Sequence, residues 1–268
     1  MLKDITLGQY FPGNSFIHRL DPRTKILTLI VYIVALFLAD GIVSYALMLG
    51  FLLFCIGVSR IPVKAFVRGM KPLVFILVFT AALNLFLTPG ETVLAHFWVI
   101  TITLEGVVRA AFMLVRILML ITCTFLLTYT TSPIALTDGL ESLLGPLKKI
   151  KVPVHELSMM MCIALRFIPT LIEETDKIMS AQKARGADFE TGKLMDRVRA
   201  LIPILIPLFI SAFRRADELA TAMECRCYHG GEGRTKMKLL RYKRCDFQAY
   251  AGTLLVLIAV VVLVQFSL

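Results

Sequence analysis

Long apolar runs with almost no charge make up much of this chain. Between Ile26 and Ser59 the only charged residue is Asp40. A single helix over that run would measure about 50 Å, well beyond a bilayer hydrocarbon core of ~30 Å. The pattern therefore predicts two helices that turn near Asp40-Gly41. Asp21-Pro22 precedes the first of them and supplies an N-cap followed by the proline that favours a helix start.

Three further apolar runs complete the set of predicted membrane spans. They cover Pro72–Thr88, Leu104–Thr130 and Ala249–Leu268, and each is long enough to cross a bilayer, with tilt where needed. We therefore expect an all-α polytopic membrane protein with about five transmembrane helices. Residues 1–130 would form a cytoplasmic N-terminal segment and four spans, and residues 246–268 the last span.

The part between these spans, residues 131–245, has a different pattern. Ser132-Pro133 opens a short helical stretch, and two longer helical patterns follow, from His155 to Arg185 and from about Ile202 to Arg226. Both have apolar residues on one face, start apolar and end charged, and carry prolines near the start. Their apolar starts are too short to span a bilayer. We interpret residues 131–245 as a region of long amphipathic cytoplasmic helices inserted before the last span.

The composition supports a membrane protein. Apolar residues make up 57% of the 268 residues and the mean hydropathy is +0.78. The formal net charge of +10 could indicate a nucleic-acid partner, but polytopic proteins also collect lysine and arginine on their cytoplasmic side. We favour the second interpretation, so the lipid bilayer is expected as a partner and nucleic acid is not.

The short loops set the expected orientation. The segment before the first span and the 59–71 loop are rich in lysine and arginine, whereas the 40–41 turn and the 88–103 loop contain neither. Because basic loops stay in the cytoplasm, the N-terminus and residues 131–245 are predicted to lie inside and the C-terminus outside.

Signatures of enzymes and of metal sites are missing from the sequence. His155-Glu-Leu-Ser-Met159 has methionine where a zinc helix needs its second histidine, and there is no P-loop, no GxSxG and no GxGxxG. Cys225-Arg-Cys227 could be half of a zinc site, but no second ligand pair completes it. We expect no catalytic residue, cofactor or bound metal. Arg116, within the fourth span, needs a polar partner there: it could pair structurally with Asn84 or a backbone carbonyl, or line a transport path.

A repeated helix end is the most informative feature. Ala184-Arg185-Gly186 ends the first amphipathic helix, and Cys225-Arg226-Cys227 stands 41 residues later, near the end of the second. An arginine followed by glycine is an ordinary helix stop. The second copy lacks that glycine, and we place its stop later, at Gly230-Gly231. Helix termination then explains the first glycine but not the arginine in both copies, so we predict that both arginines contact a partner.

The chain resembles the energy-coupling factor (ECF) transporter transmembrane component, the T subunit of a class of prokaryotic ABC importers. Three motifs carry the resemblance: His18-Arg-Leu-Asp-Pro-Arg-Thr-Lys25, Arg166-Phe-Ile-Pro169 and Ala184-Arg-Gly186 with its second copy. They occur in the same order over nearly the whole chain. The second copy departs from the family pattern, because cysteines replace the alanine and the glycine beside Arg226.

The resemblance implies a non-enzymatic coupling subunit in the cell membrane. Its two arginine ends, Ala184-Arg185-Gly186 and Cys225-Arg226-Cys227, would dock into grooves on two ATP-binding ATPase subunits. A separate membrane-embedded S component would capture a vitamin or a transition-metal ion. Two alternatives stay open: a conventional ABC permease that lines its own substrate path, and an integral-membrane enzyme acting on lipid or isoprenoid phosphate. The first should carry one coupling loop and the second clustered acidic or histidine residues, and we find neither in the sequence.

Overall fold

A computed structural model describes residues 10–87, 92–97, 100–187, 194–230 and 239–266. By its internal contacts the chain divides into two compact units. One is made of residues 8–140 and 240–268, and the other contains residues 141–239. We call them the membrane unit and the hairpin unit, and describe each by itself.

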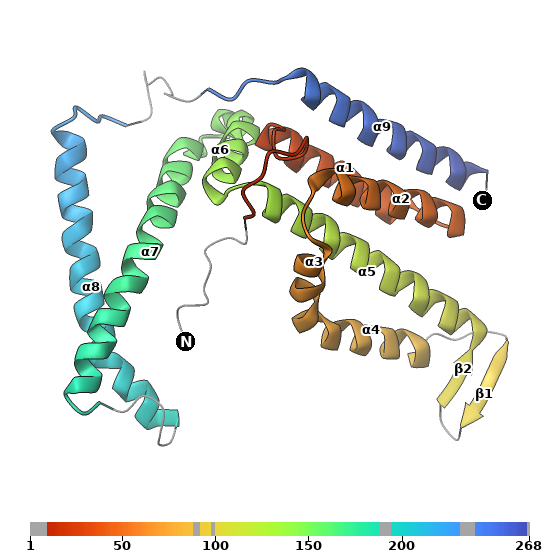
Figure 1. Ribbon diagram of the computed structural model, residues 1–268, viewed down its shortest axis with the longest axis horizontal. Helices are drawn as coiled ribbons and strands as arrows, with labels where there is room; N and C mark the ends of the chain where they lie inside the picture. The colour runs from red at the N-terminus through yellow and green to blue at the C-terminus, as the bar shows by residue number, and fades with distance from the viewer. Residues whose placement is uncertain (1–9, 88–91, 98–99, 188–193, 231–238, 267–268) are drawn as a thin grey trace. The chain divides into compact units, whose positions relative to one another are not determined.

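The membrane unit is built from helices whose limits follow the apolar runs (Figure 1). Its long helices are α1 (Pro22–Leu38), α2 (Ile42–Ser59), α4 (Val74–Leu87), α5 (Leu104–Thr130) and α9 (Arg244–Gln265). A short helix α3 (Val63–Met70) and the 3-10 turn η2 (Lys71–Leu73) lead into α4. The α6 helix (Pro133–Leu143) follows α5.

The predicted turn and helix start are both confirmed. The first helix ends at Leu38 and the second begins at Ile42, with Gly41 in a positive-φ conformation (φ 96°) that residues with a Cβ avoid. Asp21 is the N-cap of α1, where its carboxylate accepts the backbone N–H of Arg23 at 3.0 Å. The helix start therefore has the capping partner that its sequence predicts.

A short β hairpin joins α4 to α5 and was not predicted. Its strands β1 (Val93–Phe97) and β2 (Ile100–Thr103) pair antiparallel, with an irregular register between Val93 and Ala95. Thr103 then caps α5, because its hydroxyl accepts the N–H of Gly106 at 3.2 Å. The all-α class is confirmed for the helices that make up the rest of the described chain.

The core of the membrane unit lies where α1, α2, α5 and α9 meet. Tyr32 and Leu36 of α1, Met48 of α2, Met119 of α5 and Val260 of α9 are almost completely buried there. Tyr32 also donates its hydroxyl to the carbonyl oxygen of Met48 at 3.3 Å. Four helices, the first and last of them more than two hundred residues apart in the chain, thus share one apolar core, and α4 packs along α5 beside it.

Buried polar bonds join the start of α1 to the start of α9. Asp246 is fully buried and accepts the N–H of Asp21 at 2.8 Å and that of Lys243 at 2.7 Å. Arg23 donates to the carbonyl of Leu240 at 2.8 Å. We call Asp21, Arg23, Lys25 and Asp246 the polar junction. Its burial explains why α9 begins at Arg244 rather than at Ala249, as the apolar run predicted: the charged Asp246 in the first turn is hydrogen-bonded inside the protein.

Lys25 extends the polar junction to α5. Its ammonium group donates to the carbonyl of Thr130 at 2.8 Å and to the hydroxyl of Thr131 at 3.2 Å. His18 of the same motif bonds Ser15 at 2.6 Å and the carbonyl of Phe11 at 2.9 Å. The motif from His18 to Lys25 therefore ties α1, α5 and α9 together at one end of the unit.

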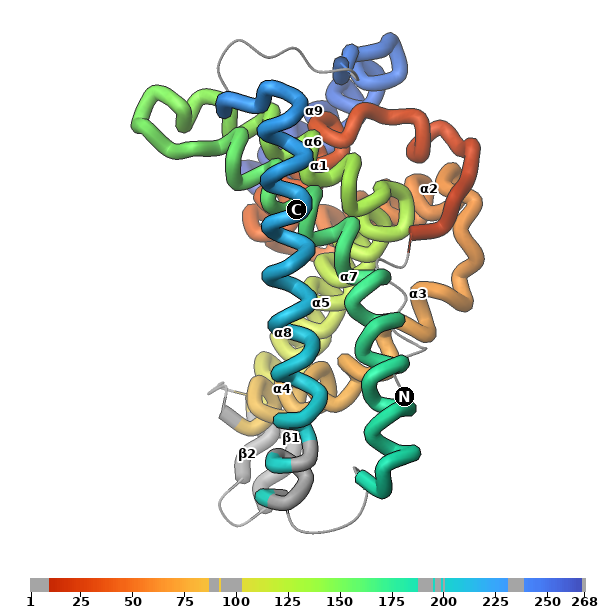
Figure 2. Tube along the Cα trace, turned by 90° about the vertical axis from the view of Figure 1, so that its left-hand side faces the viewer, coloured from red at the N-terminus to blue at the C-terminus, as the bar shows by residue number. Residues whose placement is uncertain are grey.

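The hairpin unit consists of two 31-residue helices. A 3-10 turn, η3 (Gly145–Ile150), precedes α7 (Val154–Ala184), and α8 (Leu194–Glu224) follows it. These helices run antiparallel and side by side (Figures 1 and 2). Both of the predicted amphipathic helices are present, although α8 begins eight residues before the expected Ile202. Pro169, Pro203 and Pro207 lie inside the helices without ending them.

Five described helices are long and apolar enough to cross a membrane: α2, the run Val63–Phe86, α5, α7 and α9. The number matches the prediction, but the set differs, since α7 stands in place of α1. At 17 residues, α1 is about 25 Å long, at the short end for a spanning helix. The first half of α7 carries only Glu156 and Arg166 as formal charges, so by length and composition it qualifies, against our expectation.

Removing the acid of the polar junction should destabilise the membrane unit. Asp246→Ala leaves the buried N–H of Asp21 without an acceptor, a loss of about 1–3 kcal/mol or more for a charged partner. We expect a clear fall in the thermal unfolding midpoint of the purified protein in detergent. Asp40→Ala, in the exposed turn between α1 and α2, is the matched control. Equal midpoints for the two variants would contradict the role assigned to Asp246.

Candidate functional site

The end of α7 has the hydrogen bonds of a Schellman cap. The N–H of Ala187 bonds the carbonyl of Gln182 at 3.0 Å, and the N–H of Gly186 bonds that of Lys183 at 3.0 Å. Gly186 takes the left-handed conformation (φ 87°) that this cap requires. Arg185 is consequently the last residue before the left-handed residue of the cap, and its side chain is exposed.

The end of α8 has the same cap in the same register. The N–H of Tyr228 bonds the carbonyl of Met223 at 3.0 Å, and the N–H of Cys227 bonds that of Glu224 at 2.8 Å. Cys227 takes the left-handed conformation with φ 58°. Arg226 therefore occupies the position that Arg185 has in α7, also with an exposed side chain.

This geometry corrects the predicted stop of α8. We expected the helix to continue to Gly230-Gly231, but it ends at Glu224 and its left-handed residue is Cys227; Gly231 lies outside the described residues. The prediction failed because a Cβ disfavours the left-handed region, so glycine was taken as the signal. The two ends are more alike in backbone than in sequence. Ala184, Arg185 and Gly186 occupy the same positions in the first cap as Cys225, Arg226 and Cys227 in the second.

The antiparallel packing places the two arginines at opposite ends of the hairpin unit. Glu174 of α7 and Arg215 of α8 form an ion pair at 2.7 Å, and Phe167 and Leu219 line the same interhelical groove. In that register Arg226 is level with Ile163 in the first half of α7, about 22 residues, or ~33 Å along the axis, from Arg185. One hairpin thus presents two equivalent ends that are far apart.

Neither guanidinium is engaged within the part of the chain that the structure describes. No hydrogen bond or ion pair joins Arg185 or Arg226 to another described residue, and all six residues of the two motifs are exposed. An unpaired guanidinium offers five donors in a planar fork that suits carboxylates and carbonyl oxygens. Both ends are therefore available for charge-assisted contacts with an acidic surface.

Arg116 contacts a backbone carbonyl and two aromatic rings. Its guanidinium donates to the carbonyl of Ala39, at the end of α1, at 3.3 Å, and lies 5.7 Å from the ring centroid of Phe37 and 5.6 Å from that of Tyr45. Asn84 is not its partner, since its amide donates to the carbonyl of Thr80. Of the two interpretations left open, these contacts favour the structural pair with a backbone carbonyl over a transport path.

Metal binding finds no support in the described residues. No group of three or more histidine, cysteine, aspartate or glutamate side chains is arranged there to hold a metal ion. Cys225 and Cys227 are exposed and flank Arg226. Cys225 directly follows the last residue of α8 and donates its N–H to the carbonyl of Thr221 at 2.9 Å, and Cys227 is the left-handed residue of the cap.

Two functional features escaped the sequence reasoning. The ion pair between Glu174 and Arg215 could not be assigned, because it depends on how α7 and α8 pack. Small residues of α8 at every fourth position, Ala212, Ala216 and Ala220, line the groove beside α7. That spacing is a signal that could have identified the contact face, since it gives a helix surface with a shallow groove.

Glycine at position 227 should strengthen the second helix end. The left-handed conformation costs a residue with a Cβ roughly 1–2 kcal/mol, and Cys227→Gly removes that cost. We expect slower amide hydrogen exchange at Cys227 and Tyr228 positions, whose N–H groups form the cap. Cys225→Gly, one position before the arginine in helical backbone, is the control and should not slow exchange. Faster exchange in Cys227→Gly would refute the cap assignment.

Comparison with known proteins identifies the family. Residues 13–237 match the family model described as CbiQ, cobalt transport protein. An energy-coupling factor transporter transmembrane protein EcfT of Acidaminococcus fermentans is 55% identical over 266 residues, covering 99% of this chain and 97% of the relative. Those of Listeria innocua and Bacillus subtilis are each 48% identical, over 92% and 90% of this chain and 93% and 91% of their own lengths.

These relatives are named as transporter components and not as enzymes, which argues against the membrane-enzyme alternative. With its candidate spanning helices, the protein is a multi-pass protein of the cell membrane. The chain belongs to the CbiQ family and, within it, to the transmembrane components of energy-coupling factor transporters.

Proposed function

We propose that this chain is the coupling subunit of an ECF-type importer, transmitting ATP-driven motion of two ATPase subunits to a membrane-embedded S component. The S component would capture a vitamin or a transition-metal ion. The observation that carries the proposal is the repeated helix end, in which one backbone motif presents an exposed arginine twice. Two equivalent ends match a partner that is itself present in two copies or in two similar forms.

Docking of each end follows from its shape and charge. The arginine is the last residue before the backbone reverses hand, so the helix end is narrow and the guanidinium stands at its tip. An acidic groove on an ATPase subunit would accept it through charge-assisted bonds to carboxylates and carbonyl oxygens. The cysteines at 225 and 227 widen the second end relative to Ala184 and Gly186, so its groove should be wider or packed less closely.

The apolar face of α8 supports a second contact, with the S component and the bilayer. Several of its large apolar side chains are between 45% and 68% exposed in the isolated chain: Leu201, Ile202, Leu205, Ile206, Phe209, Ile210 and Phe213. A contiguous apolar surface of this kind marks an interaction site. Together with the arginine at its end, α8 has one part suited to a membrane partner and another suited to a soluble one.

We further propose that residues 131–245 are cytoplasmic, with the N-terminus inside and the C-terminus outside. The excess of lysine and arginine in the N-terminal segment, the 59–71 loop and residues 131–245 supports this orientation. Although α7 is apolar enough to span, its second half carries Glu173, Glu174, Asp176 and Lys177. Burying that half in hydrocarbon would be costly.

Coupling requires an element with two arrangements that the nucleotide state biases. When ATP draws the two ATPase subunits together, their grooves would move the ends of α7 and α8, and the crossing of the helices would change. The alternative of a conventional permease predicts a single coupling element and a substrate path within this chain. The doubled helix end favours the coupler.

Reversing the charge at either helix end should disrupt ATPase binding. In Arg185→Glu or Arg226→Glu the new carboxylate would be repelled by an acidic groove on the ATPase subunit. We expect a loss of association of at least ~10-fold in a pull-down from membranes expressing all subunits. Lys177→Glu is the control, since Lys177 is exposed on α7 two turns before Arg185. Unchanged association and transport in both arginine variants would refute the docking assignment.

Exchange of the α7–α8 ion pair offers a test of mechanical coupling. Arg215→Glu places two acids 2.7 Å apart in the original geometry and should weaken the crossing and reduce uptake. The exchanged variant, Glu174→Arg with Arg215→Glu, should restore part of the lost uptake, with ATPase association unaffected throughout. Uptake that is indifferent to Arg215→Glu would show that this crossing does not transmit motion.

A further inference from the structure

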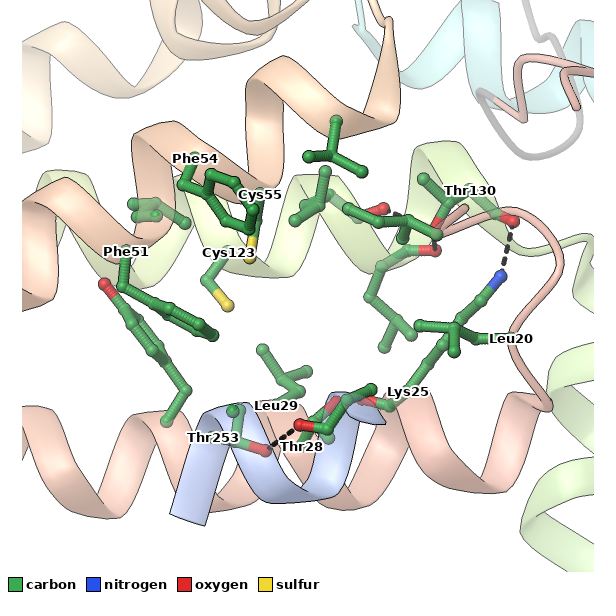
Figure 3. A pocket seen from close by; sticks show the side chains of 18 of the residues that line it. Leu20, Lys25, Thr28, Leu29, Phe51, Phe54, Cys55, Cys123, Thr130 and Thr253 are labelled. Atoms are coloured by element: carbon green, nitrogen blue, oxygen red, sulfur yellow. Dashed lines mark hydrogen bonds between the residues drawn. The ribbon is translucent and has the colours of Figure 1, made fainter. Parts of the chain in front are cut away.

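The membrane unit contains a cavity that coupling to the ATPases does not use. It has a volume of about 520 Å³ and lies among α1, α2, α5, α9 and the segment before α1 (Figure 3). This volume is within the ~300–1,000 Å³ typical of ligand sites in proteins. Leu29, Phe51, Cys55 and Cys123 are among the side chains that line its apolar part, and the polar side chains that line it include Lys25, Thr28, Thr130 and Thr253.

Most polar groups inside the cavity have already used their hydrogen-bond donors, and Gln248 lies exposed at its mouth. The hydroxyls of Thr28, Thr130 and Thr253 donate to carbonyl oxygens one turn earlier in their own helices. The ammonium group of Lys25 donates to the carbonyl of Thr130, the hydroxyl of Thr131 and the carbonyl of His18. A polar ligand would find few partners inside, and so would water. The wall therefore favours a hydrocarbon ligand.

The mouth of the cavity is apolar on one side and has a positively charged side chain nearby. Phe54 of α2 is 67% exposed at its rim, and Gln248 and Gly252 of α9 line it. A Cβ added at Gly252 would have no heavy atom within 4 Å, so this stretch of wall is open space. Arg244 lies four residues before Gln248 on the same face of α9, is exposed, and has no hydrogen bond or ion pair with another described residue.

We propose that this cavity binds one acyl chain of an anionic phospholipid, with the phosphate against Arg244. The wall selects hydrocarbon, and the exposed guanidinium selects an anionic headgroup at the end of the cavity nearest the start of α9. An empty cavity would forfeit the dispersion contacts of its lining. In a chain that spans the bilayer, the surrounding lipids supply acyl chains that can enter the cavity. The bound chain bridges α2 and α9 beside the polar junction.

The position of the site gives it a structural consequence. The same α1 and α9 residues that frame the cavity, Lys25 and the turn after Asp246, belong to or adjoin the polar junction. Occupancy therefore fixes the spacing of α2 and α9 at the end where the polar junction holds α1 to α9. Lipid bound there should raise the thermal stability of the membrane unit, independently of whether the helix ends bind ATPases.

The test uses delipidated full-length protein titrated with phosphatidylglycerol and followed by native mass spectrometry. In Gly252→Phe the new ring fills the cavity, so we expect the affinity for the first lipid to fall at least ~10-fold. Gly50→Phe is the matched control: Gly50 is an exposed glycine of α2, its Cβ position is equally open and it does not line the cavity. Arg244→Gln should weaken phosphatidylglycerol more than phosphatidylcholine.

Equal lipid affinity in the wild type, Gly252→Phe and Gly50→Phe would overturn the proposal. So would displacement of phosphatidylglycerol by detergent alone without loss of thermal stability, which would mean an adventitious amphiphile only. A second measurement does not depend on the variants folding. Phosphatidylglycerol with a photoreactive group at the end of one acyl chain should label the wild-type protein at Leu29, Cys55 or Cys123. Labelling confined to other segments would overturn the site.

Discussion

The antiparallel pairing of α7 and α8 is the constraint on which the proposed docking arrangement depends. Two helices of equal length that end in the same cap would present their arginines side by side if they ran parallel. Because they run antiparallel in a register set by Glu174 and Arg215, Arg185 and Arg226 lie at opposite ends of the hairpin unit. The groove residues of α8 are small, which lets the large side chains of α7 approach, and the interhelical ion pair is only partly buried. Such a crossing is held by modest forces and can change its angle without unfolding either helix.

The membrane unit shows the opposite balance of forces. Asp246 and Lys25 are buried, and each forms a hydrogen bond to a segment more than a hundred residues away in the chain. Removing any one partner would leave a buried charge or a buried N–H unpaired, which is costly in an apolar surrounding. A unit tied at one end in this way is suited to hold its helices fixed. The contrast between a firmly bonded membrane unit and a lightly bonded hairpin would suit the proposed role of transmitting motion.

Sequence reasoning succeeded where the physics is local. The limits of α5 coincide with the apolar run, because a capping threonine precedes it and Ser132-Pro133 follows it, and the N-cap at Asp21 is set by residues next to one another. It failed where a distant partner changes the local preference. The start of α9 was placed five residues late, since the sequence does not show that Asp246 is satisfied by the N–H of Asp21. The stop of α8 was placed at glycine, although Cys227 takes the left-handed conformation. The two arginines were found from their repetition, but their equivalence became visible only in the backbone hydrogen bonds.

The most direct measurement is photocrosslinking from the two arginine positions in the purified complex. A photoreactive residue would replace Arg185 in one preparation and Arg226 in another, and the crosslinked peptides would be identified by mass spectrometry. If each helix end occupies its own groove, both positions crosslink to ATPase subunits, at the same surface of two separate copies or of two homologous subunits. Crosslinks from both positions to one ATPase molecule, or from either position only to lipid or to the S component, would contradict the coupling arrangement.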